Sequence, residues 1–303
     1  MASQPDDGVV TTDAADDYAL LDCGAGRRLE SFGSLVLDRP APGAVGRPRS
    51  PERWAEAMTY RRGLGWRTAS GAPPEEAATP IRIGGITVEI RPTTGGQVGL
   101  FPEHAAHARW LTDAVRRRLA PAGAAQVPEV LNLFGSTGLA TLIVARAGGA
   151  AVHVDSSRPA VAWGRRNAER SGLSDRPIRW IVDDALAFVR REHRRGRRYA
   201  GLVLDPPSYG HGPNASTRAW EFDRRIAELL EACRGVADPE AFWLVTTHTP
   251  GWDAEMLATS LAAAVGGTPG SVVGISAVLT ATSGATLRLG AAARLDPHLA
   301  ERR

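Results

Sequence analysis

The chain has 303 residues, 43% of them hydrophobic, and its 36 basic and 33 acidic side chains give a formal net charge of +3. This composition is typical of a globular protein, and the chain is long enough for a large α/β domain plus a smaller one. The small positive net charge permits nucleic-acid binding without requiring it. Two cysteines exclude a disulfide framework and a zinc site built from cysteine alone, and since every basic residue is arginine, lysine chemistry is excluded as well.

The first hundred residues divide into a tail and a β-rich segment. Residues 1–16 are polar and aspartate-rich, which predicts a disordered tail, and they lack the features of a signal peptide. No apolar run reaches membrane-spanning length, so we expect a cytoplasmic protein with no membrane partner. In residues 17–98, short apolar runs alternate with glycines, and Ile81–Ile83 and Ile86–Ile90 flank a two-glycine turn as in a hairpin. We therefore expect a small β-rich N-terminal domain over 17–98 and a main domain over 99–303.

After a helical pattern from Pro102 to Leu119, the stretch Val130–Asp155 has the pattern of one β-α-β unit. Its first apolar run ends in a small-residue loop at Phe134–Gly138, and its second stops on Asp155. The loop glycines let backbone approach a ligand, and Asp155 can accept hydrogen bonds from both hydroxyls of a ribose. The loop lacks the lysine and the Ser/Thr of a phosphate-binding loop, which predicts a nucleoside ligand without a polyphosphate.

Similar units follow along the chain. Helices are expected over 159–170, around Leu186 and Val189, over 222–233 and before residue 276; strands are expected at 178–182, 199–204 and 242–245, with a closing hairpin at 276–282 and 286–292. Three consecutive strands end in acidic residues, at Asp155, at Asp183 with Asp184, and at Asp205. In a parallel sheet these residues share the carboxyl edge, where ligands bind. The fold class predicted is α/β, a doubly wound and mostly parallel sheet.

Four motifs in this order carry a resemblance: N-L-F-G-S-T-G, V-D-S-S, V-D-D-A and L-D-P-P-S-Y-G. Together they resemble the class I S-adenosylmethionine-dependent methyltransferases, and among these the bacterial 23S ribosomal-RNA methyltransferases of the cytosine-5 and guanine-N7 type. The resemblance runs from about Tyr18 to Arg294. It implies a seven-stranded Rossmann-like methyltransferase sheet, S-adenosylmethionine as cofactor and RNA as substrate.

The resemblance also implies roles for individual residues. Phe134, Gly135 and Gly138 would line the methionine and adenosine parts of the cofactor. Asp155 would hold the ribose, and Asp184, or alternatively Asp183, would meet the adenine amino group. The further positions given to the cofactor are Phe101, Glu103, Asn132, Ser156 and Asp205. The sequence has His104 where that group leads us to expect glutamine.

The D-P-P motif supplies the expected chemistry. Asp205 and the Pro206 carbonyl form a pair of acceptors that could bind the N–H group of a base or amine while the lone pair of that nitrogen faces the methyl group. Tyr209 could stack on a planar substrate. Related cytosine-5 enzymes place a nucleophilic cysteine where this chain has His248, and Cys233 falls on an apolar helical stripe. We therefore expect a nitrogen or oxygen acceptor, His248 as a further catalytic candidate, and no metal.

Structural alternatives stand beside these functional roles. Aspartates after strands often cap helices, His248 could be an ordinary loop histidine, and the arginines of 190–198 fit a solvated cluster better than an RNA contact. Arg61, Arg62 and Arg116–Arg118 are other candidates for RNA contacts. The leading hypothesis is methylation of a base nitrogen in ribosomal RNA. The alternatives are a small-molecule N- or O-methyltransferase and a non-catalytic nucleoside- or RNA-binding module.

Overall fold

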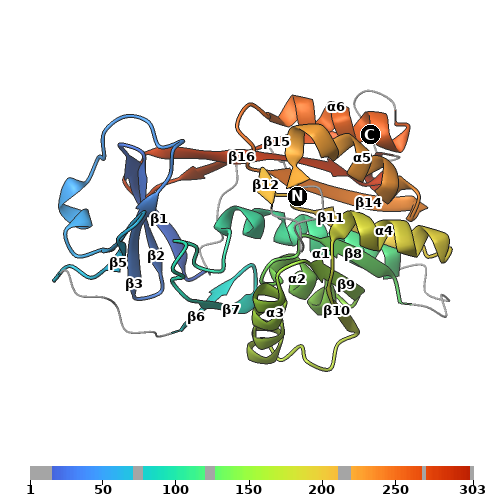
Figure 1. Ribbon diagram of the computed structural model, residues 1–303, viewed down its shortest axis with the longest axis horizontal. Coiled ribbons are helices and arrows are strands. Elements are labelled where there is room, and N and C mark those ends of the chain that lie inside the picture. The colour runs from blue at the N-terminus through green and yellow to red at the C-terminus, as the bar shows by residue number, and fades with distance from the viewer. Residues whose placement is uncertain (1–15, 71–77, 120–126, 211–219, 268–270, 301–303) are drawn as a thin grey trace, which may run out of the picture. The chain divides into compact units, whose positions relative to one another are not determined.

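A computed structural model of the chain describes residues 16–70, 78–119, 127–210, 220–267 and 271–300 (Figure 1). The chain forms two compact units. The larger unit contains Ala108–Ser276 and Gly290–Arg303, and the N-terminal unit contains Val9–His107 together with Ala277–Leu289. The sequence-based division at residues 98 and 99 remains a prediction, and the predicted tail lies almost entirely outside the described residues.

The N-terminal unit contains a five-stranded sheet in the order β1-β2-β3-β4-β5 and a separate hairpin of β6 and β7. The strands are β1 (Tyr18–Gly24), β2 (Arg27–Phe32), β3 (Leu35–Pro40), β4 (Met58–Arg61), β5 (Gly65–Arg67), β6 (Thr79–Ile83) and β7 (Ile86–Ile90). Ile83 pairs with Ile86 across the glycine turn, so the structure has the hairpin that the sequence predicts there. Two short 3-10 helices, η1 (Pro51–Trp54) and η2 (Pro102–His107), also belong to this unit.

Most of a seven-stranded sheet, in the order β10-β9-β8-β11-β14-β16-β15, belongs to the larger unit. The strands of the sheet are β8 (Glu129–Leu133), β9 (Ala150–Asp155), β10 (Ile178–Val182), β11 (Tyr199–Leu204), β14 (Ala237–Thr247), β15 (Val273–Thr280) and β16 (Thr286–Leu295). The first five pair in parallel, and β16 runs antiparallel to β14. The predicted mostly parallel, seven-stranded α/β sheet is confirmed.

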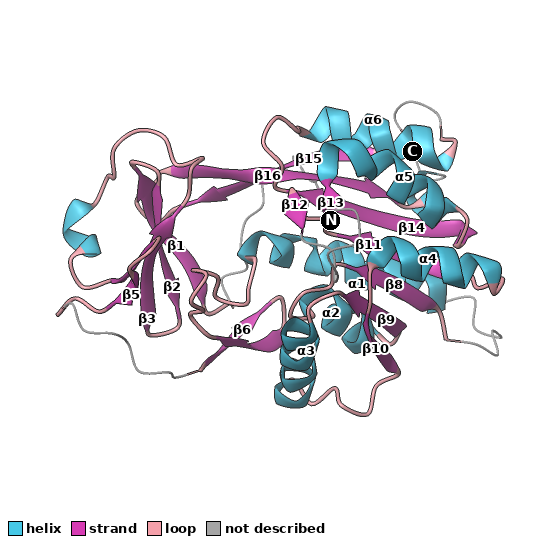
Figure 2. Cartoon of the chain, viewed as in Figure 1, coloured by secondary structure: helices cyan, strands magenta, loops and turns pink. Residues whose placement is uncertain are grey.

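Helices cover both sides of this sheet (Figure 2). They are α1 (Ala108–Leu119), α2 (Leu139–Ala147), α3 (Arg158–Arg170), α4 (Ala185–Arg194), α5 (Phe222–Arg234) and α6 (Ala254–Val265), with a short α7 (Pro297–Ala300) near the end of the chain. The pattern from 102 to 119 predicted one helix, whereas the structure has η2 followed by α1. No described helix is long and apolar enough to cross a membrane.

The core of the larger unit explains the apolar runs of the sequence. Inward-facing residues of the strands pack against the apolar stripes of the helices; fully buried examples are Leu131, Val152, Leu202, Phe222 and Leu229. Strands that are buried on both faces have continuous apolar sequences, which is why these strands could be predicted from the sequence.

Candidate functional site

The carboxyl ends of four parallel strands lie at one level. Leu133 at the end of β8 is aligned with Val154 of β9 and with Leu204 of β11, which is in turn aligned with Val245 of β14. The next residues along these strands, Phe134, Asp155, Asp205 and Thr246, therefore share one edge of the sheet. This is the arrangement that the sequence predicted for the acidic strand ends.

The loop after β8 has an unusual backbone. Phe134 and Ser136 have φ angles of 55° and 50°, in the left-handed region that residues with a Cβ seldom adopt, and Gly138 has a φ of 92°. For Phe134 and Ser136 such conformations cost of order 1–3 kcal/mol each and persist only where the surroundings hold them, whereas glycine adopts them freely. Here the Gly135 N–H donates to the Val154 carbonyl at 3.1 Å, and the Gly138 N–H donates to the Gly135 carbonyl at 2.9 Å.

Asp155 is fixed by two backbone donors. Its Oδ2 accepts from the Ser136 N–H and its Oδ1 from the Ser157 N–H, both at 2.8 Å. Ser157, not Asp155, caps α3, so helix capping does not account for this carboxylate. Burial raises the pKa of Asp155, the two N–H donors lower it, and the charge of Asp205 raises it further. Each oxygen keeps a lone pair for another donor, as a ribose diol requires.

Polar groups buried beneath the loop determine its shape. The Asn132 amide donates to Thr141 Oγ1 at 2.8 Å, and that hydroxyl lies 2.9 Å from His153 Nδ1. A Cβ on Gly135 would lie 2.5 Å from the His153 ring, so the loop can occupy this position only with glycine there. Burial lowers the pKa of His153 to about 3, which leaves the imidazole neutral. Asn132, a predicted cofactor residue, thus takes part in a buried network.

The start of α2 has no side-chain cap. Its N-cap is Gly138, which has no side chain that could accept from the N–H groups of the first turn. The preceding Thr137 carbonyl accepts from the buried Asn167 amide at 2.9 Å, which holds the loop against α3. A helix start of this kind attracts an anionic group such as a carboxylate.

Asp183 and Asp184 each have a structural partner. Asp184 is the N-cap of α4, and its side chain accepts a hydrogen bond from the Ala187 N–H at 2.8 Å. The structure therefore shows the helix-capping role that the sequence analysis left open for an aspartate after a strand. Asp183 accepts from the Asp184 N–H at 2.8 Å and pairs with Arg191. Their roles toward adenine stay predictions, as does that of Ser156, which lies between Asp155 and the cap of α3.

The D-P-P segment follows β11. Asp205 Oδ1 accepts a 2.6 Å hydrogen bond from the Thr246 hydroxyl, and Pro206 is buried. Tyr209 begins β12 (Tyr209–Gly210), which pairs with β13 (Trp220–Glu221), and its side chain is 77% exposed. Sequence reasoning did not find Trp220, whose indole N–H donates to the Pro207 carbonyl at 2.5 Å and whose ring lies 5.2 Å from that of Phe134.

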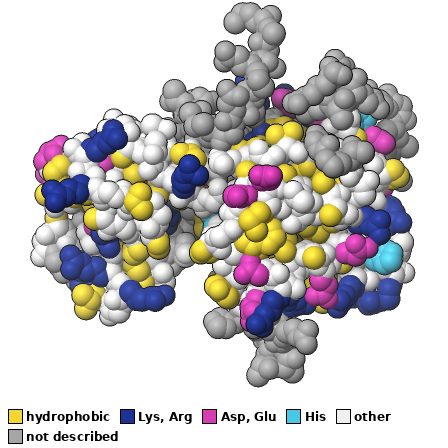
Figure 3. Space-filling view, turned by 90° about the horizontal axis from the view of Figure 1, so that it is seen from above, with side chains coloured by type: hydrophobic (Ala, Val, Ile, Leu, Met, Phe, Trp, Pro, Cys, Tyr) yellow, Lys and Arg dark blue, Asp and Glu magenta, His cyan; other side chains and the backbone are white. Residues whose placement is uncertain are grey.

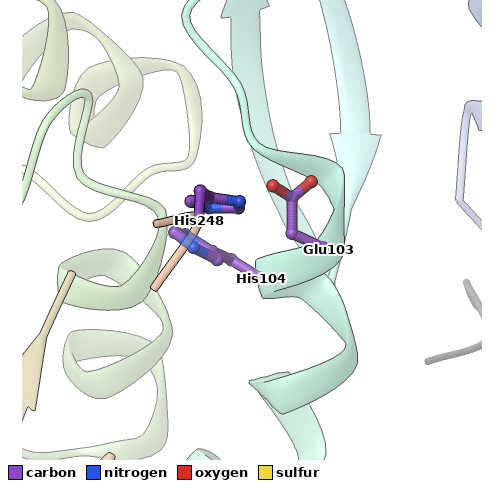
Figure 4. A group of neighbouring side chains, drawn as sticks. All are labelled: Glu103, His104 and His248. Atoms are coloured by element: carbon purple, nitrogen blue, oxygen red, sulfur yellow. The ribbon is translucent and has the colours of Figure 1, made fainter. Parts of the chain in front are cut away.

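Three further site candidates belong to other elements (Figure 4). Glu103 and His104 lie on η2 of the N-terminal unit, and the Phe101 ring just before it stacks on His104 with centroids 5.7 Å apart. His248 follows β14 directly. The cofactor role of Phe101 and Glu103, the catalytic role of His248 and the predicted absence of metal remain predictions.

Cys233 and most arginine candidates have structural surroundings. Cys233 is fully buried in the core, and burial raises the pKa of its thiol. The arginines of 190–198 form ion pairs with nearby acids: Arg190 with Glu228, Arg191 with Asp183, Arg195 with Glu192 and Arg197 with Glu129. Arg117 and Arg118 both bind Asp296, at 2.5 and 2.6 Å. These contacts support the structural interpretation of both clusters.

The strand order, the loop after β8 and the carboxylate edge define a class I, Rossmann-like nucleoside-binding fold. No family model matches the chain. The crystal structure of the SAM-dependent methyltransferase from Agrobacterium tumefaciens has a TM-score of 0.83 and 30% identity, over 95% of this chain and 93% of that one. A Streptococcus mutans protein assigned as a SAM-dependent methyltransferase has the same fold, with a TM-score of 0.71 and 15% identity over 93% of this chain and 75% of that one.

Among curated proteins, the Ribosomal RNA large subunit methyltransferase I of Aeromonas hydrophila is 29% identical over 191 residues, which are 62% of this chain and 42% of that protein. The chain thus spans less than half the length of this relative. The chain belongs to the S-adenosylmethionine-dependent methyltransferases. The family's cofactor fits the site, because Asp155 can accept from a ribose and the start of α2 can face a carboxylate.

Proposed function

We propose that this chain transfers a methyl group from S-adenosylmethionine to a base nitrogen of RNA, most specifically ribosomal RNA, in the cytoplasm. The observation that carries the proposal is the shared edge of Asp155 and Asp205, on either side of the strained loop after β8. A ribose-holding carboxylate and an acceptor for the substrate then lie within one site. The named RNA methyltransferases among the relatives support the substrate class.

In the proposed reaction, some residues of the site bind the cofactor and others position the substrate. Asp155 would hold the ribose, the start of α2 would attract the carboxylate of the methionine part, and Phe134 would pack beside the adenosine. S-adenosylmethionine supplies an electrophilic methyl group, which needs an aligned nucleophile and little acid-base help. Asp205, oriented by Thr246, and the Pro206 carbonyl would accept the N–H bonds of an amine and so aim its lone pair.

The surroundings of the cysteines favour nitrogen over carbon as the acceptor. Methylation at cytosine C5 requires covalent attack by a thiolate at C6. Cys233 lies in the core with its pKa raised by burial, and Cys23 is buried in the N-terminal unit. No thiol among the described residues follows β14, where His248 stands. A direct transfer to nitrogen needs none.

The test is transfer of a tritiated methyl group into total RNA and, separately, into a metabolite extract. Wild-type protein is compared with Asp205→Ala and with Asp175→Ala, an exposed aspartate far along the chain from the motif. We expect label in RNA with wild type and Asp175→Ala, none with Asp205→Ala, and an N-methylated base on mass spectrometry. Label in the metabolite extract alone would support a small-molecule enzyme instead; 5-methylcytosine would overturn the nitrogen acceptor; and label in neither, with retained cofactor binding, would support a binding module.

A further inference from the structure

A surface pocket of about 360 Å³ lies within the N-terminal unit, on the side formed by β4, β5 and the segment after η1. It falls in the size range of small-ligand sites. Its lining is aromatic, aliphatic, hydroxylated and cationic, without an acidic side chain: Trp54, Ala55, Ala57, Thr59, Arg61, Leu64, Arg67, Thr68 and Ala69. None of the motifs that define the methyltransferase site contributes to it.

The alternation of the two strands directs specific side chains to the pocket. Thr59 pairs with Arg67 across β4 and β5, and Arg61 pairs with Gly65. Side chains two residues apart share one face of a strand, so Thr59 and Arg61 emerge beside Arg67. The intervening Tyr60 and Trp66 face the other way, and their rings pack together at 5.2 Å. Arg61 and Arg67 are exposed, and so is Leu64 in the connecting turn.

The Trp54 ring is held in place at the pocket. Its indole N–H donates to Asp22 Oδ2 at 3.1 Å, and the ring packs on the small cluster of Leu21, Leu29 and Ala57. Asp22 is fully buried. Burial opposes ionisation of Asp22, yet hydrogen bonds from Ser283, Ser50, Trp54 and Arg49 lower its pKa to about 2. The part of Trp54 left exposed is thus a fixed aromatic surface.

The pocket has a net positive character. Asp38, whose carboxylate accepts from Thr59, is neutralised by Arg27 at 2.6 Å. Among the described residues, neither Arg61 nor Arg67 has an acidic side chain in ion-pair contact, and Arg67 donates only to the Trp66 carbonyl. Figure 3 shows basic side chains spread across the N-terminal unit on the face that it draws.

We propose that this pocket binds one unstacked nucleotide of a single-stranded RNA, with the base on Trp54 and Leu64 and a backbone phosphate on Arg61 and Arg67. The inference rests on the proposed function and extends it to a second RNA contact outside the methyl-transfer site. Aromatic surfaces stack on any base, and the planar guanidinium group matches phosphate with two parallel hydrogen bonds. A duplex offers no unstacked base, so the pocket selects single strands.

The test is the binding of a fluorescently labelled oligoribonucleotide of about ten nucleotides, followed by anisotropy with the full chain. The double variant Arg61→Gln/Arg67→Gln is compared with Arg47→Gln/Arg288→Gln, which removes the same charge from exposed residues of the N-terminal unit that do not line the pocket. We expect the pocket variant to bind about tenfold more weakly and to lower the salt slope of log affinity by about 1 to 2. The control should change affinity less than about twofold, and a duplex of the same length should bind about tenfold more weakly than the single strand.

Equal losses in the two double variants, no loss in either, or equal binding of duplex and single strand would overturn the proposal. Methyl transfer measured on the same proteins separates this inference from the proposed activity. If the wild-type protein methylates RNA and the pocket variant binds RNA as well as wild type does, the pocket proposal is wrong and the proposed activity is supported. If RNA binding depends on the pocket arginines but the wild-type protein methylates no RNA, the pocket proposal is supported and the proposed activity is wrong.

Discussion

The Thr246 hydroxyl donates a 2.6 Å hydrogen bond to Asp205 Oδ1 across the carboxyl ends of β11 and β14. Both residues follow aligned strand positions, so this contact links the orientation of the proposed acceptor to the neighbouring strand. A carboxylate held in one rotamer can keep a substrate amine in line with a methyl donor, whereas a rotating one cannot.

Replacing Thr246 with valine should therefore lower kcat rather than cofactor affinity. A hydrogen bond to a charged group contributes about 1.5–3 kcal/mol, which corresponds to a loss of roughly tenfold to a hundredfold in kcat. The control is Thr247→Val, since Thr247 is also buried but bonds to Thr249. Steady-state kinetics and titration with S-adenosylhomocysteine measure the two quantities. Equal kcat losses in both variants would show that Asp205 does not depend on this contact.

Asp155→Asn should weaken cofactor binding. The amide has one oxygen where the carboxylate has two, and the Ser136 and Ser157 N–H groups already occupy both. We expect a loss of about 1.5–3 kcal/mol in binding free energy and also a lower melting temperature, because the Ser136 or the Ser157 N–H loses its acceptor. Calorimetric titration against the exposed Asp175→Asn control checks this. An unchanged dissociation constant would remove Asp155 from the cofactor site.

Gly135→Ala should destabilise the larger unit, because the added methyl would lie 2.5 Å from the His153 ring. Overpacking of this kind costs about 1–3 kcal/mol. The double variant Gly135→Ala/His153→Ala should cost less than the sum of its single variants, because removing the ring makes room for the methyl. Denaturant unfolding of the four proteins gives the coupling energy; purely additive losses would contradict the contact.

Sequence patterns predicted the features that follow from chain geometry. Asp155 and Asp205 could be assigned to one edge because parallel strands deliver their ends together. The pattern could not separate the two uses of an aspartate after a strand: Asp184 caps α4 while Asp155 caps nothing. Nor could it reveal the partners of His153, because it lies inside an apolar run and its hydrogen bond to Thr141 depends on how α2 packs on β9.

The buried imidazole of His153 should make stability depend on pH. Burial lowers its folded-state pKa to about 3 from an ordinary value of 6.5, so between these limits the unfolded chain binds a proton that the folded chain does not. Unfolding is then favoured as the pH falls from 6.5, by up to about 1.4 kcal/mol per pH unit. Well above pH 6.5 both states are neutral, and this residue contributes no pH dependence.

His153→Gln keeps a polar side chain that cannot titrate. The free energy of unfolding of this variant should therefore lose the part of its pH dependence below pH 6.5 that His153 causes. The free energy of unfolding, measured in denaturant at several pH values between 7.5 and 4.5, should fall less steeply for this variant than for wild type. His193→Gln, which replaces an exposed histidine of α4, should retain the wild-type slope. Parallel curves for wild type and His153→Gln would show that the imidazole takes up its proton in the folded protein. It would then not be the neutral group that lies beneath Gly135 and beside Thr141.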